Sequence, residues 1–364
     1  MSKFRVVHCA YSGVGGTGSF VSELCPRLRE QHGDGGGVVF YGVEPLHPDY
    51  ARRLANAGIW YSEVLKRPGI DLPSRWELAR ALRRVEADVV VMHGGGSAWQ
   101  WPLLRVMGVH SRMVLVEHGP EAACSSASGA LRHAISINSA DAVIAVSDRL
   151  AACLKSKYSV FVRGKPVHAI PNGTDTEFFR PQANTRSLGY LFMAGTLSAT
   201  KDHATLLQAV ALLAKRRPVQ LRLAGDGALR SRLEDHVRGL GIRELVRILG
   251  NLDRAQLLRQ YREAAVFTFA TKGEGSPLAL LEAMSCALPV VASDVPGVRE
   301  ILGGGQRGLL APPEDPMAMA SAIERILGDE ELARRMGTNA REYVENNHSA
   351  TRMAARYWEV LNAL

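Results

Sequence analysis

The sequence predicts an α/β protein with two domains, each a doubly wound parallel sheet covered by helices. Short, almost continuously apolar segments alternate with helical patterns, as is typical of parallel sheets that are buried on both faces. This alternation restarts after a break rich in Pro, Asn, Thr and Gly. A chain of 364 residues is also long enough for two domains with separate cores. We expect strands at 4–10, 36–42, 87–93, 112–118, 141–147 and 165–171 before the break, and at 188–195, 219–225, 245–251, 264–270 and 288–294 after it.

The break at 171–187 sets the expected domain boundaries. We expect two Rossmann-like domains, at about 1–180 and 181–345. In doubly wound sheets, ligands bind beyond the carboxyl ends of the strands. The loops that follow the predicted strands are therefore the expected positions of functional residues.

The bulk composition narrows the class of protein. Hydrophobic residues make up 46% of the chain and charged residues 22%, as in an ordinary globular protein. No apolar run approaches the roughly 20 residues of a membrane span, and the N-terminal segment has no signal-peptide pattern. The five cysteines form no CxxC pair, which favours reduced thiols over a disulfide framework or a zinc site. We therefore expect a cytoplasmic protein.

The net charge of +8 is compatible with nucleic acid, an anionic membrane surface or anionic substrates. The basic residues are not interleaved with an aromatic platform, which argues against a nucleic-acid partner. A basic amphipathic helix is expected at 74–87, and such a helix can rest on the inner face of an anionic membrane. An ordinary solvated helix face explains the same pattern. The basic residues of this segment are Arg75, Arg80, Arg83 and Arg84, and its apolar residues include Trp76, Leu78 and Leu82.

The stretch 270–294, ATKGEGSPLALLEAMSCALPVVASD, is the most informative part of the chain. Ser276 is a suitable N-cap, and Pro277 fits a first helical position, so we expect a helix that continues through Leu278. Gly275 leaves the backbone open at this helix start, where free N–H groups and the helix dipole favour an anion. The stretch therefore predicts an anion site at the start of a helix.

Two carboxylates, Glu274 and Glu282, flank this expected anion site. Glu274 precedes it in the loop, and Glu282 follows about two turns into the helix. Carboxylates accept hydrogen bonds from hydroxyl groups, so a phosphorylated sugar, and best a nucleotide sugar, fits this combination.

The run EGSPLALLEAM, followed by LPVVASDVPGVREIL, resembles the donor-site signature of the retaining glycosyltransferases of family 4. The resemblance implies the GT-B fold, in which two Rossmann-like domains face each other across a cleft and a final helix, here 346–364, crosses back to the first domain. It implies that the first domain binds the acceptor and the second the donor. It also implies that Glu274 faces the donor sugar and that Glu282 holds the ribose hydroxyls of the nucleotide.

The loop after the first expected strand contains Gly13, Gly15 and Gly18 in a GxGxxG pattern before a helix. Without the Lys of a P-loop, a kinase or ATPase is excluded. A dinucleotide site with Glu44 on the ribose remains one interpretation. The other follows from the resemblance, which places the backbone N–H groups of Gly15 and Gly16 at the donor diphosphate.

His118 ends the strand expected at 112–118, and a lone His at a strand end is commonly structural. The resemblance assigns His118 to the family's His that touches the donor sugar near the reacting carbon. His93 ends the preceding strand and is a weaker candidate, for the acceptor.

The segment after the strand 188–195 supplies further donor contacts. The resemblance assigns Lys201 to the diphosphate, where its charge would stabilise the leaving nucleotide. Family members commonly carry Arg at the position of Thr196, so this departure weakens the diphosphate clamp. The resemblance also places 249–251, including Asn251, near the nucleobase.

These patterns lead to one expected function with three alternatives. We expect a metal-independent, retaining hexosyltransferase without a cofactor that uses a UDP- or GDP-sugar. The acceptor is expected to be a glycan, a lipid-linked sugar or a small molecule, in polysaccharide or lipopolysaccharide biosynthesis. No Asp-x-Asp follows a strand, which argues against a metal-bound diphosphate. The alternatives are a nicotinamide or flavin enzyme, a GT-B nucleotide-sugar epimerase, and a catalytically silent sugar-nucleotide-binding subunit.

Overall fold

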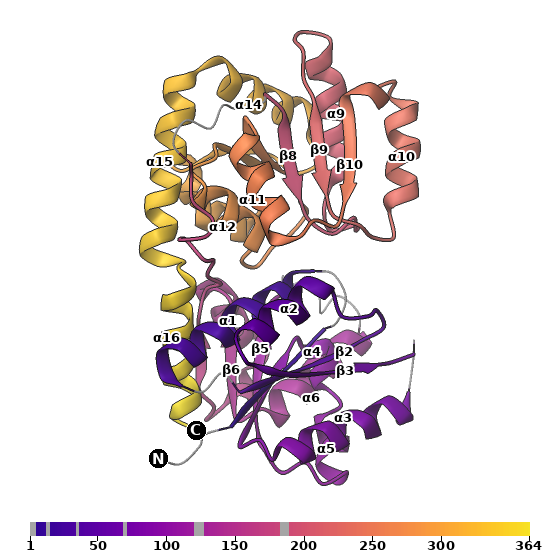
Figure 1. Ribbon diagram of the computed structural model, residues 1–364, viewed down its shortest axis with the longest axis vertical. Helices are drawn as coiled ribbons and strands as arrows, with labels where there is room; N and C mark the ends of the chain where they lie inside the picture. The colour runs from indigo at the N-terminus through magenta and orange to yellow at the C-terminus, as the bar shows by residue number, and fades with distance from the viewer. Residues whose placement is uncertain (1–4, 12–14, 34–35, 68–70, 120–126, 183–188) are drawn as a thin grey trace. The chain divides into compact units, whose positions relative to one another are not determined.

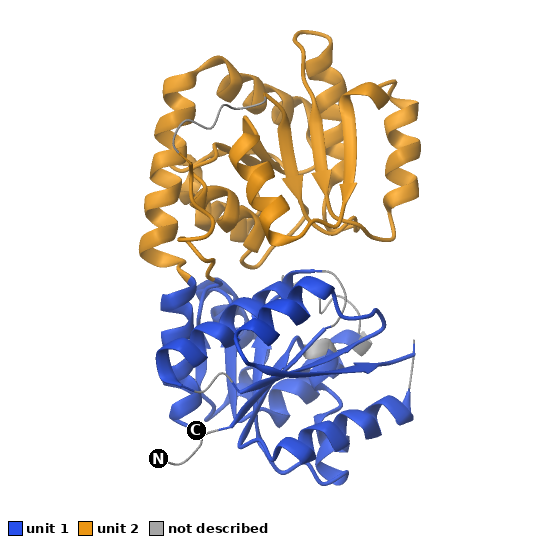
Figure 2. Cartoon of the chain, in the orientation of Figure 1, with its two compact units in different colours: residues 1–172, 350–364 blue, residues 173–349 orange. Residues whose placement is uncertain are grey.

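The computed structural model describes residues 5–11, 15–33, 36–67, 71–119, 127–182 and 189–364, and divides the chain into two compact units. Unit 1 comprises residues 1–172 and 350–364, and unit 2 comprises residues 173–349 (Figure 2). The division falls between Asn172 and Gly173, upstream of the boundary expected at 180/181 but inside the segment rich in Pro, Asn, Thr and Gly.

Unit 1 contains a seven-stranded sheet in the order β3-β2-β1-β4-β5-β6-β7, with every pairing of named strands parallel (Figure 1). Its strands are β1 (Val6–Ala10), β2 (Gly37–Gly42), β3 (Trp60–Leu65), β4 (Val89–His93), β5 (Arg112–Glu117), β6 (Ala142–Ala145) and β7 (Val167–Ala169). Its helices are α1 (Gly16–His32), α2 (Pro48–Asn56), α3 (Leu72–Val85), α4 (Gly95–Ala98), α5 (Trp101–Val106), α6 (Ala127–Ser139), α7 (Asp148–Lys157), α8 (Ser159–Val162) and α16 (Ala350–Asn362).

Unit 2 contains a six-stranded sheet in the order β10-β9-β8-β11-β12-β13, again with every named pairing parallel. Its strands are β8 (Leu191–Ala194), β9 (Leu221–Ala224), β10 (Val246–Gly250), β11 (Val266–Phe269), β12 (Val290–Ser293) and β13 (Leu309–Ala311). Its helices are α9 (His203–Ala214), α10 (Arg230–Gly239), α11 (Arg254–Glu263), α12 (Leu278–Ser285), α13 (Pro296–Leu302), α14 (Pro316–Gly328) and α15 (Glu330–Asn347), with 3-10 turns η2 (Arg243–Leu245) and η3 (Gly303–Gly305).

Two of the four edge strands, β3 and β13, were not expected from the sequence. Inner strands such as β4 and β11 are buried at every residue and therefore appear as nearly continuous apolar runs. The edge strand β3 is largely exposed, with only Val64 of its residues buried, and β13 has three residues. Neither strand therefore has the continuous apolar sequence from which we predicted the other strands.

The last helix, α16, belongs to unit 1 and packs on α1. The ring of Trp358 stacks on His32 with centroids 4.5 Å apart, and the side-chain amide of Gln31 donates to the carbonyl of Thr351 at 3.1 Å. These contacts join the end of the chain to the first helix after the glycine loop.

Helix α3 differs from the basic amphipathic helix expected at 74–87. It begins at Leu72, because the side chain of Asp71 caps it by accepting from the N–H of Ser74 at 3.3 Å. Arg75 is 7% exposed and lies on the packed side of the helix, whereas the arginines at 80, 83 and 84 are exposed. The exposed basic face therefore has one arginine fewer than the sequence pattern predicted.

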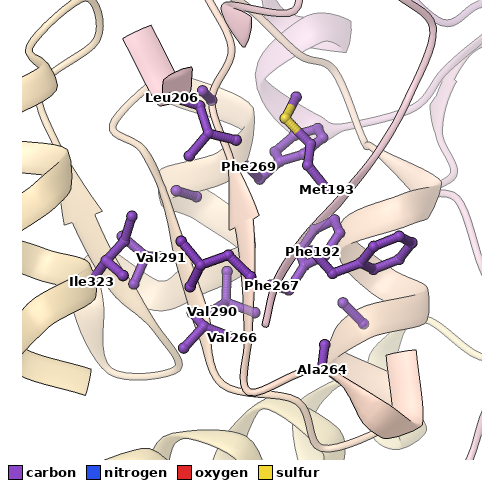
Figure 3. Packing of buried hydrophobic residues seen from close by; sticks show 14 of the residues in the cluster. Phe192, Met193, Leu206, Ala264, Val266, Phe267, Phe269, Val290, Val291 and Ile323 are labelled. Carbon is purple, nitrogen blue, oxygen red and sulfur yellow. The ribbon is translucent and has the colours of Figure 1, made fainter. Parts of the chain in front are cut away.

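The core of unit 2 contains a cluster of aromatic side chains on and beside strands β8 and β11. Phe192, Phe267 and Phe269 line the inner strands β8 and β11 (Figure 3). Tyr261 of α11 packs edge-on against Phe192 and Phe267, with ring centroids 5.2 and 5.7 Å away. This aromatic cluster fixes the sheet and α11 relative to each other, since edge-to-face pairs add to simple burial.

Candidate active site

In unit 2, two predicted residues meet where the sheet order reverses. The chain runs outward from β8 through β9 to β10 and then returns to β11 beside β8. Ligands of doubly wound sheets bind at such a switch point, beyond the carboxyl ends of the strands. Lys201 follows β8 and Glu274 follows β11, and the ammonium group of Lys201 forms an ion pair with the carboxylate of Glu274.

The ion pair is held by its surroundings. The side chains of Lys201 and Glu274 are 17% and 14% exposed. The Lys201 ammonium lies 4.6 Å from the centroid of the Phe269 ring, a cation–π contact. The Thr271 hydroxyl lies 3.2 Å from the same carboxylate oxygen and donates to it. The pair therefore places a fixed positive charge directly beside a carboxylate that can accept from a hydroxyl.

The backbone of the loop that carries Glu274 closely approaches a glycine of helix α13, Gly297. A Cβ atom at Gly297, near the start of α13, would lie 2.3 Å from the carbonyl oxygen of Glu274 and 2.5 Å from that of Gly275. Side-chain carbons do not approach backbone oxygens that closely, so only glycine permits this contact. Sequence reasoning assigned no role to Gly297, although it lies within the VPGVREIL run that carried the resemblance.

Glu282 projects from the second turn of α12 and is held by the aromatic core. The Tyr261 hydroxyl donates to Glu282 at 2.8 Å. Burial, followed by the neighbouring Glu282 charge, raises the pKa of Tyr261 well above its usual value, so Tyr261 remains a donor. A tyrosine inside a core thus orients the carboxylate assigned to the ribose hydroxyls, and nothing in the local sequence of α12 indicated it.

The start of α12 differs from the prediction. The N-cap is Pro277, with φ −73° and ψ 117°, and the helix begins at Leu278 without a side-chain cap. Ser276 is therefore not the N-cap, and Pro277 is not the first helical residue. The extended backbone of Pro277 moves the first turn one residue along the chain, which puts the Ser276 side chain one position too early to cap it.

The ends of β8, β9 and β10 are joined by close backbone contacts. A Cβ at Gly225 would lie 2.0 Å from the carbonyl oxygen of Gly195, and the N–H of Gly225 donates to Gly250 at 2.7 Å. Thr196 and Asn251, which follow β8 and β10, are both exposed at this edge. Both residues therefore lie at the carboxyl end of the sheet, as do Lys201 and Glu274.

In unit 1, the described part of the glycine loop is fastened by a tyrosine. Gly15 is the N-cap of α1 with φ 148°, and Gly16 is its first residue, with open space where a side chain would be. The Tyr50 hydroxyl donates to the carbonyl of Gly15 at 3.0 Å. A Cβ at Gly18 would lie 2.4 Å from the Tyr50 ring. Gly13, the first glycine of the pattern, lies outside the described residues.

Three histidines form a continuous series, here called the histidine series, across neighbouring strands β1, β4 and β5. His8 Nδ1 lies 3.0 Å from His93 Nε2, and His93 Nδ1 lies 2.9 Å from His118 Nε2. Phe20 of α1 contacts the rings of His93 and His118 edge-on. His93, which we expected as a weaker candidate for the acceptor, is buried, and both of its ring nitrogens are engaged with the neighbouring histidines.

Burial keeps the histidine series neutral. It lowers the pKa of His8 to about 3 and that of His118 to about 4, and it lowers the pKa of His93 well below its usual value, with the neighbouring rings adding to the effect. Each neutral ring carries one N–H and one bare nitrogen, so the two hydrogen bonds must run in the same direction.

The buried end of the histidine series selects that direction. His8 Nε2 is buried, and no described residue lies within hydrogen-bond distance of it. A bare nitrogen is tolerated there better than an unsatisfied N–H, because orphaned buried donors are the rarer case. This favours donation from His8 to His93 and from His93 to His118. His118 then keeps its proton on Nδ1, from which it can donate a hydrogen bond.

The structure brings the predicted residues together in two groups. In unit 2, Lys201 and Glu274 are in contact, and Glu282, Thr196 and Asn251 lie on the following helix or on neighbouring strand ends. In unit 1, His118 follows β5, and Gly15 and Gly16 begin α1. The residues that sequence reasoning missed are the supports: Tyr50, Tyr261, Phe269, Gly297 and, in the histidine series, His8.

The described parts of the chain offer neither a cluster of metal ligands nor a membrane-spanning helix. No group of three or more His, Cys, Asp or Glu residues there is arranged to hold a metal ion. None of the helices described is both long and apolar enough to cross a membrane.

Two family profiles match the chain and together cover most of it. The profile described as glycosyltransferase family 4 matches residues 14–178, and that described as glycosyl transferases group 1 matches residues 175–343. An exopolysaccharide phosphotransferase from Streptomyces coelicolor is 32% identical over 80% of this chain, but the match spans only 30% of that longer protein. The N-acetyl-alpha-D-glucosaminyl L-malate synthase of Bacillus anthracis is 24% identical over 98% of this chain and 96% of its own.

Solved structures show the same fold over the whole chain. A sucrose-phosphate synthase from Thermosynechococcus elongatus has a TM-score of 0.82 at 23% identity, covering 99% of this chain and 98% of its own. The Anabaena protein HepE, solved in complex with UDP-glucose, has a TM-score of 0.81 at 17% identity, covering 99% and 100%. With these matches and two parallel-sheet units, the chain belongs to the family 4 glycosyltransferases of GT-B fold.

Proposed function

We propose that this glycosyltransferase moves a hexose from a nucleoside diphosphate sugar to a hydroxyl group, with retention of configuration at the anomeric carbon. The observation that carries the proposal is the contact between Lys201 and Glu274 at the switch point of the unit 2 sheet. A cation for the leaving diphosphate and a carboxylate for the sugar hydroxyls are adjacent there, as the two halves of a nucleotide sugar require.

Lys201 supplies most of the positive charge at the diphosphate, because Thr196 occupies the position where the family commonly has Arg. As the bond between the anomeric carbon and the phosphate oxygen breaks, negative charge develops on the leaving diphosphate. Lys201 offsets that charge, and the cation–π contact with Phe269 keeps its ammonium group in place. Thr196 can donate a hydrogen bond to the same group but adds no charge.

We propose that transfer proceeds on one face of the sugar. The electron pair of the breaking bond leaves with the phosphate oxygen, and the acceptor oxygen bonds to the anomeric carbon from the same side. The acceptor proton passes to the departing phosphate oxygen, so no enzyme base is needed. Within this scheme Glu274 and the donating Nδ1 of His118 hold the sugar hydroxyls.

The donor is proposed to be a UDP-sugar, with a GDP-sugar as the other choice, and to need neither a metal ion nor a cofactor. HepE, which shares the fold, was solved with UDP-glucose. Glu282, held by Tyr261, is proposed to accept from the ribose hydroxyls, while Asn251 lies near the nucleobase. The backbone of Gly15 and Gly16 at the start of α1 is proposed to approach the diphosphate.

For the acceptor we propose a glycan, a lipid-linked sugar or a small molecule at the cytoplasmic side of the membrane, in the synthesis of a polysaccharide or lipopolysaccharide. The exopolysaccharide relative supports that setting, whereas the relative named as an N-acetyl-alpha-D-glucosaminyl L-malate synthase supports a small acceptor. The exposed arginines at 80, 83 and 84 of α3 offer a basic surface for peripheral contact with anionic lipid.

The first test is a thermal-shift titration against UDP, GDP, ADP and dTDP, with a chelator present and NAD as a comparison. A nucleotide at 100 times its Kd stabilises the fold by about 2.7 kcal/mol, which gives a clear shift. We expect one nucleoside diphosphate to raise the melting temperature more than the others, and Glu282→Ala to remove that shift. Equal responses to all nucleotides and NAD, or no response, would refute the proposal.

Analysis of the products then separates the remaining alternatives. Incubation of the winning nucleotide's glucose conjugate should release nucleotide slowly, and NMR of a transferred product should show the donor's anomeric configuration. Interconversion of the sugar on the intact nucleotide would identify an epimerase instead. A donor that binds and remains intact indefinitely would identify a silent binding subunit.

A further inference from the structure

Unit 1 contains two arginines whose guanidinium groups lie over one tryptophan ring. The Cζ atom of Arg75 is 4.9 Å from the centroid of the Trp99 ring, and that of Arg132 is 5.5 Å from it. Arg75 is 7% exposed, whereas Arg132 is exposed. Two positive charges therefore contact the same aromatic ring, and one of them is buried.

No carboxylate of the described residues compensates these two charges. Neither Arg75 nor Arg132 takes part in an ion pair there, in contrast to the half-buried Arg53, which meets Glu23 at 2.7 Å. Near Arg75 in the sequence, the Asp71 carboxylate is engaged with backbone N–H groups at the start of α3, and the exposed Glu77 forms no ion pair with Arg75. A buried guanidinium without an anion is costly, and a cation–π contact offsets only part of that cost.

The backbone segments that carry Arg75 and Trp99 are tied together by a buried hydrogen-bonded group. The hydroxyl of Tyr41 lies 3.2 Å from the Ser74 hydroxyl and donates to the Gln100 side chain at 3.3 Å. Ser74 precedes Arg75, and Gln100 follows Trp99. The hydrogen bonds of Tyr41 therefore hold the backbone from which the side chains of Arg75 and Trp99 project. A site built in this way is organised before its ligand arrives.

The location is one where a ligand is expected. Helices α3, α4 and α6 follow strands β3, β4 and β5, so Arg75, Trp99 and Arg132 all lie near the carboxyl ends of the unit 1 sheet. Lys66, just after β3, adds a third positive charge, with its ammonium 5.6 Å from the Tyr41 ring. The group of basic residues therefore belongs to the ligand edge of the sheet.

We propose that the acceptor carries an anionic group, a phosphate or a carboxylate, which binds to Arg75 and Arg132 beside Trp99. Guanidinium groups bind both anions with paired hydrogen bonds, and the Trp99 ring holds the two arginines ready. That the ligand is the acceptor rests on the proposed function. The anion site itself rests only on unit 1.

The test uses calorimetric titration of the full chain with inorganic phosphate and, separately, with malonate. Ionic strength is held constant with chloride, and the nucleotide that wins the thermal-shift titration is kept saturating, so that the donor site is filled. We expect one or both anions to bind, and Arg132→Gln to weaken binding at least about tenfold. Arg112→Gln, which removes an exposed arginine at the start of β5, is the matched control and should leave anion binding unchanged.

The two anions distinguish the two kinds of acceptor: binding of phosphate alone indicates a phosphorylated acceptor, and binding of malonate alone indicates a carboxylate. Arg75→Gln should abolish binding of whichever anion is bound. If this variant fails to fold, the exposed Arg132 still provides the decisive comparison. Absence of binding for both anions, or binding that Arg132→Gln leaves unchanged, overturns the proposal.

Failure of this proposal is distinguishable from failure of the proposed function. Nucleotide affinity measured on the same Arg132→Gln protein should equal that of the wild type. A chain that binds nucleotide but neither anion remains a transferase with an uncharged acceptor. A chain that binds anions at Arg132 but no nucleotide keeps the anion site and loses the donor assignment.

Discussion

Mild acid should destabilise unit 1 through its histidine series, and replacing His8 by Asn should remove a defined part of that effect. Asn places its amide group where the ring nitrogen Nδ1 stood, so a donor to His93 is kept while the titrating group is lost. The comparison is between the pH dependence of wild type and variant, because the variant also loses ring packing at every pH.

The sign and size follow from the pKa values. An unfolded histidine titrates near 6.5, whereas burial lowers the pKa of folded His8 to about 3. The unfolded state therefore binds the additional proton as pH falls below about 6.5, and the free energy of unfolding falls with it. Between pH 7 and pH 5 the loss that His8 causes is about 2 kcal/mol, and the lowered pKa values of His93 and His118 act in the same direction.

The assay can be confined to unit 1. All five tryptophans, at 60, 76, 99, 101 and 358, lie in that unit, so their fluorescence follows its unfolding in urea. Unfolding free energies at pH 7, 6 and 5 should fall by about 2 kcal/mol less in His8→Asn than in wild type. His110→Asn, which removes an exposed histidine of the same unit, should behave as wild type.

Other titrating groups alter the pH dependence of unfolding equally in the wild type and in His8→Asn. His133, whose pKa is raised by its hydrogen bond to Glu117, is stabilising as pH falls and opposes the series, but it does so in wild type and variant. An equal pH dependence in wild type and His8→Asn would refute the assignment of a neutral, buried His8, and with it the direction of donation towards His118.

Three further predictions concern the unit 2 site. Glu282→Ala should raise the donor KM at least about tenfold by removing the ribose contact, whereas the exposed Glu342→Ala should leave it unchanged; an unaltered KM in the first variant would contradict the assignment. Glu274→Ala should lower kcat about 100-fold with little change in nucleotide affinity, and a wild-type kcat would show that the reacting sugar lies elsewhere. Gly297→Ala should displace the Glu274 loop and lower kcat/KM about 100-fold, while Gly239→Ala, which has open space at the end of α10, should keep full activity; equal activities of the two would mean that the loop yields freely.

Local sequence patterns predicted most of the fold because buried parallel strands carry their own signal. Strands β4 and β11 are buried at every residue and were predicted as apolar runs, whereas the edge strand β3 carried no such run. Burial on both faces requires an apolar run, which can be seen in the sequence. An exposed edge strand such as β3 does not require one, and it is identified only by its pairing with the neighbouring strand. The same limit applied at the start of α12, where the backbone of Pro277 decided the cap.

The sequence by itself determined the family and the two parallel sheets, and it predicted Glu274, Glu282 and Lys201 as site residues, because the motifs that carry them are contiguous. Only the tertiary structure decided which residues meet. Lys201 and Glu274 are 73 residues apart, and His8 and His93 are 85 apart, yet both pairs are in contact. The physical reason is the strand order: each sheet returns to its first strand, β1 or β8, after two outward steps, and so joins loops that local periodicity cannot relate.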